Sequence, residues 1–134
     1  MHIMIIGGGQ VGSYLAGLLQ EAGNRVTVVE TRETQITAVQ RTAPNTFFFL
    51  GDGTDPGVLE AAGIRTAAVV AAVTGADETN LVITSLARFA FDVQRVVARV
   101  NNPHNTWMFT PAMGVDVALN QADVMAQLIA RAVG

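Results

Sequence analysis

The sequence contains no cysteine and no lysine. Without cysteine, the chain has no disulfides, no thiolate metal ligands and no cysteine nucleophile. All eight basic residues are arginine, which excludes a P-loop lysine, a Schiff-base lysine and the Tyr-x-x-x-Lys pair of short-chain dehydrogenases. The lack of cysteine is also typical of cytoplasmic proteins, and we expect that location. Together these absences favour a binding protein over an enzyme.

The chain also has no large excess of positive or negative charge and no long apolar run. The net charge of -3 provides no electrostatic footprint for DNA or RNA, so we expect no nucleic-acid partner. No apolar run approaches the ~20 residues that a membrane helix needs. A hydrophobic fraction of 50% excludes a disordered chain, and 134 residues correspond to a single domain.

Apolar, strand-like segments alternate with helical segments along the whole chain. We expect strands at 3–6, 26–29, 47–50, 68–73, 96–98 and 115–119, and helices at 10–23, 33–41, 56–63, 76–91, 104–111 and 121–133. Nearly continuous apolar runs are typical of strands covered on both faces, as in parallel sheets. Strict alternation of strands and helices implies right-handed crossovers. The pattern therefore predicts an α/β fold with a doubly wound, six-stranded parallel sheet.

The start of the fourth expected helix carries a capping signal. Thr74 and Asp77 have the spacing of a capping box. We therefore expect Thr74 to bond the first amides of the helix while Asp77 reaches back.

A glycine-rich loop follows the first expected strand and opens the first helix. Its sequence, Gly7-Gly8-Gly9-Gln10-Val11-Gly12, is G-x-G-x-x-G. Gly7 permits a tight turn, Gly9 lets backbone approach a pyrophosphate, and Gly12 lets helix pack on strand. The helix start at Gln10 and Val11 offers free amides and a positive dipole end to phosphates. The motif predicts a Rossmann-like fold with strand order 3-2-1-4-5-6 and a phosphate site; a glycine turn without a ligand is the alternative.

An acidic residue stands where such a site expects one, about 20 positions further on at the end of the second strand. Glu30 lies 18 residues after Gly12. Its carboxylate would accept both ribose hydroxyls and repel a 2′-phosphate, which favours NAD(H) over NADP. Thr31 is assigned to the same site, and so is Arg32, although an arginine here can also accommodate a 2′-phosphate. A solvated strand-end carboxylate is the alternative for Glu30.

Further motifs extend the pattern to the whole chain. They are Gly51-Asp52-Gly53-Thr54-Asp55, Ala62-Gly63-Ile64, Ala72-Val73-Thr74-Gly75-Ala76-Asp77-Glu78-Thr79-Asn80, Ala98-Arg99-Val100-Asn101-Asn102-Pro103 and Gly114-Val115-Asp116. In this order and spacing the chain resembles the RCK family, also called KTN or TrkA-N. Members of this family are cytoplasmic regulatory domains of potassium channels and transporters.

The resemblance implies roles for individual residues beyond the glycine loop. Asp52 and Gly53 would lie beside the adenine, Val73, Thr74 and Gly75 would line the crevice beyond the fourth strand, and Arg99 would reach phosphates. Each role has an alternative: a turn or cap for Asp52, a helix cap alone for Thr74, and a structural ion pair for Arg99. Some members carry arginine where this chain has Gln10, a neutral donor, and this favours NAD(H) over ATP. The alternatives to NAD(H) are ATP, ADP and AMP.

The resemblance also implies function and assembly. The chain would be a nucleotide-sensing domain that controls a membrane potassium transporter or channel through subunit rearrangement, at the inner face of the membrane. We expect residues 1–134 to form one N-terminal RCK domain in a homodimer or ring-like oligomer. Helix 121–133 carries an apolar stripe that suits a crossover to a second subunit or packing on its own sheet. The family often continues into a second lobe, so the chain is either part of a longer protein or a stand-alone lobe.

Catalytic residues are few. Hydride transfer usually needs a proton donor such as His, Lys or Tyr near the nicotinamide. Only His2, Tyr14 and His104 are available, and His104 is better explained as a helix-entry residue. No metal-ligand spacing occurs. We therefore expect no enzymatic activity; the alternative is an NAD-dependent oxidoreductase fragment that lacks its catalytic domain.

Overall fold

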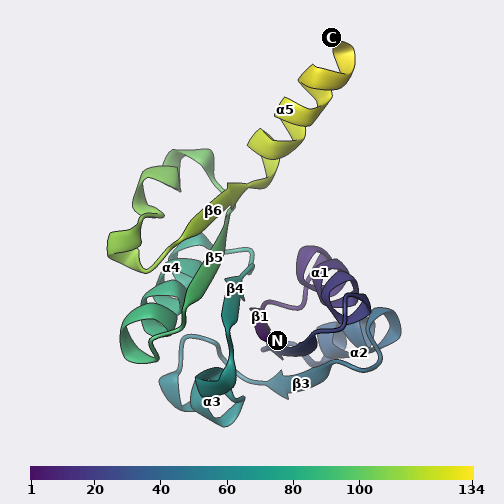
Figure 1. Cartoon of the computed structure of the whole chain (residues 1–134), viewed down its shortest axis with the longest axis vertical. Helices are drawn as coiled ribbons and strands as arrows, with labels where there is room; N and C mark the ends of the chain where they lie inside the picture. Colours follow the sequence, from purple (N-terminus) through teal and green to yellow (C-terminus); the bar gives the residue numbers. More distant parts are fainter.

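The computed structural model describes all 134 residues and contains one six-stranded sheet (Figure 1). Its strands are β1 (His2–Ile6), β2 (Arg25–Glu30), β3 (Phe47–Leu50), β4 (Val69–Ala72), β5 (Arg95–Val100) and β6 (Val117–Asn120). All neighbouring strands pair in parallel, in the order β3-β2-β1-β4-β5-β6. The predicted fold class and strand order are confirmed.

Four α-helices connect and flank the strands: α1 (Gln10–Glu21), α2 (Glu33–Thr42), α3 (Pro56–Ala61) and α4 (Asp77–Ser85). A fifth helix, α5 (Gln121–Val133), follows the last strand. Helix α4 continues into a π-helical turn, η2 (Leu86–Ala90). The helix predicted at 104–111 is wrong: the chain forms two short 3₁₀ segments, η3 (Pro103–Met108) and η4 (Pro111–Met113). Proline forces Thr110 into an extended conformation and ends the first segment there.

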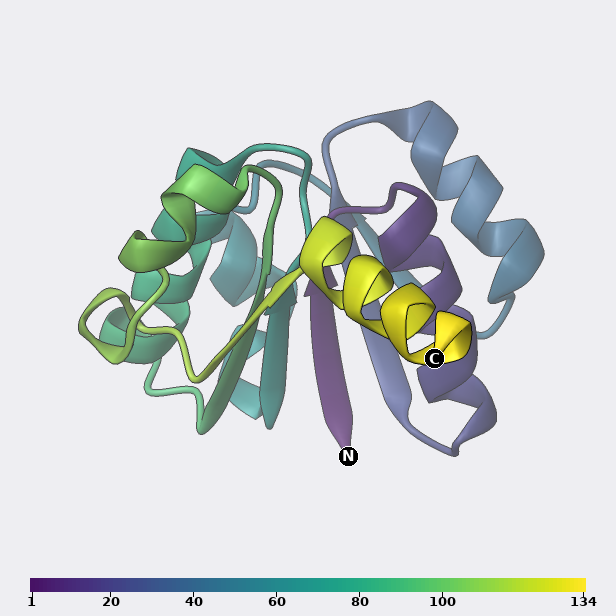
Figure 2. The same ribbon diagram turned by 90° about the horizontal axis from the view of Figure 1, so that it is seen from above.

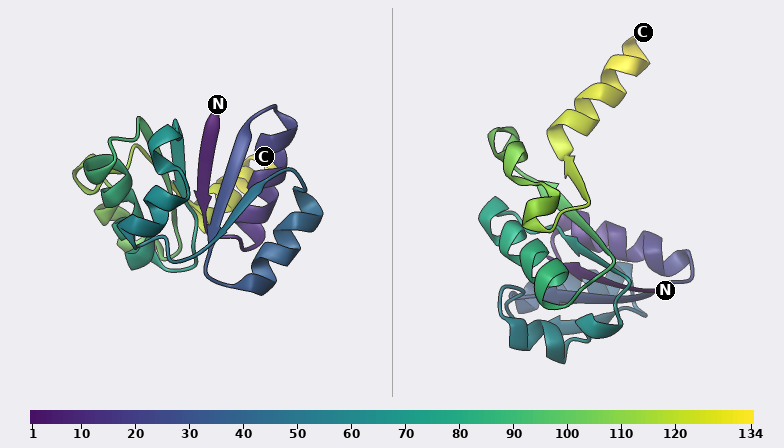
Figure 3. Two further views of the ribbon diagram at one scale, coloured as in Figure 1. Left: turned by 90° about the horizontal axis from the view of Figure 1, so that it is seen from below. Right: turned by 60° about the vertical axis from the view of Figure 1, so that its left-hand side comes forward.

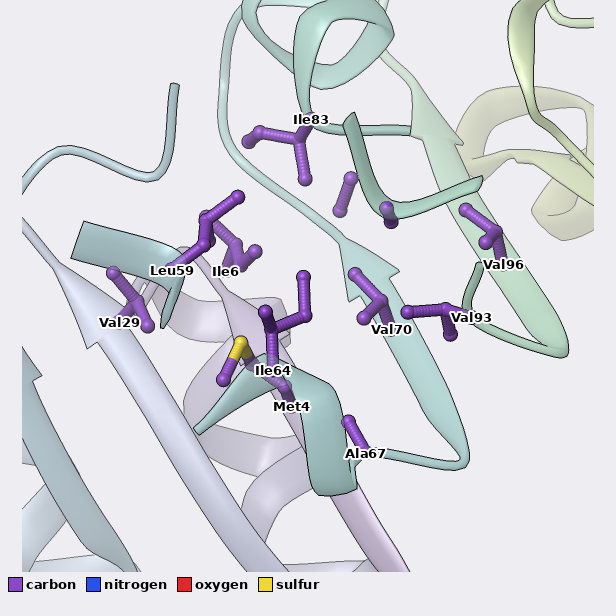
Figure 4. Close-up of a cluster of buried hydrophobic side chains, with 12 residues drawn as sticks. Met4, Ile6, Val29, Leu59, Ile64, Ala67, Val70, Ile83, Val93 and Val96 are labelled. Atoms are coloured by element: carbon purple, nitrogen blue, oxygen red, sulfur yellow. The ribbon is translucent and has the colours of Figure 1, made fainter. Parts of the chain in front are cut away.

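Helices α1 and α2 cover one face of the sheet, and α3 and α4 cover the other (Figure 2). On the α3–α4 face, Leu59 and Ile83 meet Ile6 from the central strand, and all three are buried (Figure 4). On the opposite face, Ala16 and Val39 pack on β1 and β2. Burial of the central strands on both sides explains their nearly continuous apolar sequence.

The predicted capping box at 74–77 is wrong. Ala76 is the N-cap residue of α4 and supplies no side-chain bond. The Asp77 carboxylate instead accepts the backbone N–H groups of Asn101 at 2.6 Å and Asn102 at 2.9 Å, beyond the end of β5. The segment after β5 offers the Asp77 carboxylate several N–H donors. Its bonds to these donors take the place of the one bond to the start of the helix that a capping box would form.

Helix α5 projects away from the rest of the chain (Figures 1 and 3). All of its residues are exposed, among them the apolar side chains Val124, Met125, Leu128, Ile129 and Val133. An apolar groove of about 690 Å³ lies beside its first turns, lined by residues of α1, β5 and β6. The prediction that this helix packs on its own sheet is therefore wrong. No helix has the length and apolar character needed to cross a bilayer.

Candidate nucleotide-binding site

A crevice of about 560 Å³ opens at the carboxyl ends of the central strands, where β1 lies between β2 and β4. The strand order reverses direction at this point, which is where open α/β sheets bind ligands. Eleven of the predicted site residues line it: Gly7, Gly9, Glu30, Thr31, Arg32, Asp52, Gly53, Val73, Thr74, Gly75 and Arg99. The sequence did not single out the other lining residues, Ile6, Val29, Gly51, Ala76, Thr79 and Ile83.

The turn after β1 requires glycine at two of its positions. Gly7 has φ +114°, and a Cβ there would lie 3.0 Å from the backbone of Val73 and Thr74. A Cβ on Gly12 would lie 1.8 Å from the carbonyl oxygen of Gly7, so no side chain fits. Gly9 faces open space. The turn therefore exposes backbone to the crevice at Gly9 and packs tightly on β4 and α1 at its two ends.

The three remaining residues of the predicted site, Gln10, Val11 and Gly12, do not line the crevice. Gln10 and Val11 line the apolar groove on the far side of α1 instead. Their contribution to a ligand is thus restricted to the backbone of the first helical turn, which no side chain caps and which holds no acidic residue. Uncapped amides at a helix N-terminus favour an anion such as a phosphate.

Glu30 lies at the end of β2 and is 5% exposed, so the alternative of a solvated carboxylate is wrong. Its Oε1 accepts the backbone N–H of Gly8 at 2.9 Å, and its Oε2 accepts that of Arg32 at 2.7 Å. The Arg32 guanidinium adds an ion pair at 3.1 Å. Burial alone would raise the pKa of Glu30, but the bonds from Arg32 and Gly8 outweigh it and lower the pKa to about 2.

These contacts define how Glu30 can meet a ribose. Its bonds to backbone hold the carboxylate beside the glycine turn. The Arg32 guanidinium occupies lone pairs that ribose hydroxyls would otherwise use, yet that side chain is 59% exposed. Because the guanidinium lies on the solvent side of the buried carboxylate, it can swing into water and leave the carboxylate oxygens to hydroxyl donors.

Asp52 follows β3 and forms an exposed turn. Its Oδ1 accepts the backbone N–H of Thr54 at 2.9 Å and the Thr54 hydroxyl at 2.7 Å, and these bonds lower the pKa of Asp52. Its second oxygen makes no bond to the protein, so a turn role and a ligand contact are both open to this carboxylate. Gly53 is buried, and a Cβ there would lie 2.4 Å from the side chain of Ile6.

Arg99 lies at the end of β5, half-buried between the crevice and the apolar groove. Its guanidinium forms no ion pair with a carboxylate, and its buried Nε has no hydrogen-bond partner. The reading of Arg99 as a structural ion-pair partner is therefore wrong. An unpaired cation beside uncapped amides makes the crevice attractive to anions.

Asn80, on α4, is the polar residue of this region that sequence reasoning missed. It is fully buried and bonds to Thr74 and to the backbone of Arg99. Two signals were available: Asn80 ends the motif at 72–80, and it precedes the apolar run Leu81-Val82-Ile83 in α4.

None of the candidate proton donors lines the crevice. His2 is buried at the amino end of β1, between the hydroxyls of Thr27 and Thr66 at 2.8 Å each, and burial lowers its pKa. Tyr14 borders the apolar groove, and His104 is exposed after β5. No three metal-ligating side chains gather at one point. The crevice thus offers backbone N–H donors, the carboxylates of Glu30 and Asp52, and the guanidinium of Arg99, which has no ion-pair partner.

Comparison with known proteins adds sequence relatives to this geometry. A family model described as the TrkA-N domain matches residues 3–121. The Trk system potassium uptake protein TrkA of Mycobacterium tuberculosis is 38% identical over 133 residues, which are 99% of this chain. The chain spans 60% of the length of that relative.

Solved structures share the fold. The TrkA-N domain of the inner membrane protein ybaL from Escherichia coli superposes with a TM-score of 0.85 at 18% identity, covering 99% of this chain and 96% of that one. The GsuK channel bound to NAD superposes with a TM-score of 0.82 at 27% identity, covering 96% of this chain and 22% of that one. GsuK is also known bound to ADP, with a TM-score of 0.81, 27% identity and coverage of 96% and 32%.

Proposed function

The chain belongs to the TrkA-N domain family, and on that premise we propose that it senses an adenine nucleotide, NAD(H) first, in the crevice at the ends of β1 and β4. Nucleotide occupancy changes the arrangement of subunits, and the change controls a membrane potassium transporter or channel. A ligand shifts such an equilibrium only by the difference in its affinity for the two arrangements.

One observation supports the proposal above all others. The exposed backbone of Gly9, the uncapped first turn of α1 and the Glu30 carboxylate lie around one crevice. Backbone donors and a helix N-terminus suit a diphosphate, and a carboxylate at the end of the second strand suits ribose hydroxyls. The unpaired Arg99 adds a cation for phosphate oxygens.

The ligands of solved relatives fit the same chemistry. GsuK is known with NAD and with ADP, so both NAD(H) and the shorter adenine nucleotides ATP, ADP and AMP are candidates. Gln10 lines the apolar groove, and α1 contains no basic residue, so the helix offers no cationic side chain to the additional phosphate of ATP. We therefore place NAD(H) before ATP.

Helix α5 is the element we assign to subunit contact. Its apolar stripe is exposed, and its main packing partner in the chain is β6, from which it emerges. We propose that residues 1–120 form the nucleotide-binding body, that 121–134 cross to a second copy in a homodimer or ring, and that the assembly lies at the inner face of the membrane against its transporter. No catalysis is part of this role.

Calorimetric titration of the purified chain with NADH, NAD, ATP, ADP and NADPH tests the proposal. We expect NADH or NAD to bind most tightly and NADPH most weakly, because Glu30 repels a 2′-phosphate. Tightest binding of NADPH would refute the role of Glu30. Absence of binding by all five compounds at millimolar concentration would refute the nucleotide-sensing function.

A further inference from the structure

The carboxyl ends of β4 and β5 are tied together by one buried side chain. Asn80 is 0% exposed and stands in the first turn of α4, beneath the crevice. Its side-chain amide makes four hydrogen bonds, two through the oxygen and two through the nitrogen. Oδ1 accepts the Thr74 backbone N–H at 3.0 Å and the Thr74 hydroxyl at 2.7 Å, while Nδ2 donates to the carbonyls of Thr74 at 3.1 Å and Arg99 at 3.0 Å.

We propose that Asn80 is the positioning residue of the nucleotide site: it holds the Thr74 loop and the Arg99 backbone at the spacing that keeps the Gly7 turn open to phosphates. This inference rests on the proposed function and concerns a residue that does not itself line the crevice. An asparagine is suited to the task because a buried amide fixes backbone donors and acceptors at the same time.

The Thr74 loop matters because the glycine turn is in contact with it. A Cβ at Gly7 would lie 3.0 Å from Thr74 N and from Val73 C, so the two backbones are in van der Waals contact. A shift of the Thr74 loop toward β1 would therefore displace Gly7, and with it the exposed backbone of Gly9. A shift away would widen the crevice by the same amount.

A second, weaker support reaches the same loop from the other side. Asn101 donates through Nδ2 to the Thr74 carbonyl at 3.0 Å and to the Asp77 carboxylate at 3.2 Å. Asp77 also accepts the Asn105 side chain at 2.9 Å, and these bonds hold its pKa below the usual value despite burial. Asn80 thus acts on the loop directly, and Asn101 adds to it from the segment after β5.

The main experiment measures NADH affinity of the whole chain after Asn80→Ala. We expect a loss of at least about tenfold in affinity, because the Thr74 loop loses three bonds and the Arg99 carbonyl loses a fourth. The matched control is Thr84→Val, one turn further along α4. Thr84 is also 0% exposed and bonds the Met113 carbonyl at 2.9 Å, away from the crevice. The Thr84→Val variant should have a lower melting temperature but an NADH affinity within about twofold of wild type.

Amide hydrogen exchange of the nucleotide-free chain distinguishes a positioning role of Asn80 from a general contribution to stability. Asn80→Ala should speed exchange in the turns at 7–12 and 73–76, with β2 unchanged relative to wild type; Thr84→Val should not. If Asn80→Ala does not fold, the half-buried Asn101→Ala should show the same pattern with about a threefold loss of affinity.

Unchanged NADH affinity in a folded Asn80 or Asn101 variant would overturn the inference while leaving the proposed function in place. Uniformly faster exchange would also overturn it. If the wild-type chain binds no nucleotide, the proposed function fails, and the exchange pattern still decides whether Asn80 positions the two turns.

Discussion

The nucleotide crevice and helix α5 place their side chains in opposite environments. Around the crevice, polar groups such as Glu30, Asp77 and Asn80 are buried and hydrogen-bonded. Along α5, apolar groups such as Leu128 and Ile129 are more than half exposed. Burying polar groups is costly unless they are paired, and exposing an apolar stripe is costly unless another surface covers it. The polar groups of the crevice are therefore paired within one chain, whereas the stripe on α5 is left for the second copy that we propose.

The largest effect is expected from a substitution that distorts the glycine turn beside the crevice. In Gly12→Ala the new Cβ would lie 1.8 Å from the Gly7 carbonyl, so the turn and the first helix must move apart. We expect NADH binding to be lost in calorimetry. Gly17→Ala is the matched control in the same helix, where the nearest atom lies at 3.5 Å. It should stabilise the chain by about 0.5–1 kcal/mol and keep the affinity.

The next largest effect is expected from a substitution that disrupts the exposed apolar stripe of α5. Leu128→Asp removes an apolar side chain from each copy, about 1.5–3 kcal/mol per copy, so dimer dissociation should rise more than a hundredfold in analytical ultracentrifugation. The melting temperature of the body should not change, because no residue of α5 is buried. Ala126→Asp adds the same charge on the opposite face of the helix and should leave association nearly intact. A monomeric wild-type chain at high concentration would contradict this half of the comparison.

A smaller effect sharpens the role of the buried carboxylate. Glu30→Gln should weaken NADH binding by about 1–3 kcal/mol, because charge-assisted bonds to the ribose are lost. An equal affinity in calorimetry would remove Glu30 from the site.

The acid stability of the same variant tests the buried bonds without a ligand. The pKa of Glu30 is lowered from 4.5 to about 2 in the fold, so its ionised form stabilises the chain above pH 4.5. This contribution is lost as the pH falls from about 4.5 to about 2. Urea unfolding should therefore show a larger acid loss in wild type than in Glu30→Gln. Glu60→Gln, which breaks the exposed pair with Arg65, should retain the larger wild-type loss.

The smallest effect concerns Arg32. Arg32→Ala removes the exposed partner of Glu30 and frees its oxygens for ribose hydroxyls. We expect NADH to bind slightly more tightly, by less than about 1 kcal/mol, and NADPH to bind more weakly because a cation near the 2′ position is gone. A large loss of NADH affinity would show that Arg32 contacts the nucleotide directly.

The sequence predicted most of the fold because its signals are local. Strand-length apolar runs such as Ile3 to Ile6 coincide with the strands that are buried on both faces. The glycine turn was also predictable, since its motif encodes requirements within a few residues. The helix expected at 104–111 was wrong, because Pro111 keeps Thr110 extended and divides the segment into two 3₁₀ pieces.

The remaining features depend on contacts between distant residues. Asp77 has the spacing of a capping box, yet it bonds to Asn101, 24 residues away. The bonds between Glu30 and Gly8 span 22 residues, and Asn80 reaches Arg99 across 19. No periodicity or spacing specifies which donor lies beside a carboxylate once strands are assembled. Most residues that line the crevice were thus predictable, but their hydrogen-bond partners were not.

In the proposed assembly, the isolation of α5 from the body couples its folding to association. A helix of 13 residues is marginally stable in water on its own, and packing of an apolar face supplies most of the stability of such segments. Its N-terminus is capped by the Asn120 side chain, which accepts the backbone N–H of Asp123 at 3.0 Å. The helical signal of the chain in circular dichroism should therefore grow with protein concentration, as each copy orders the last segment of another.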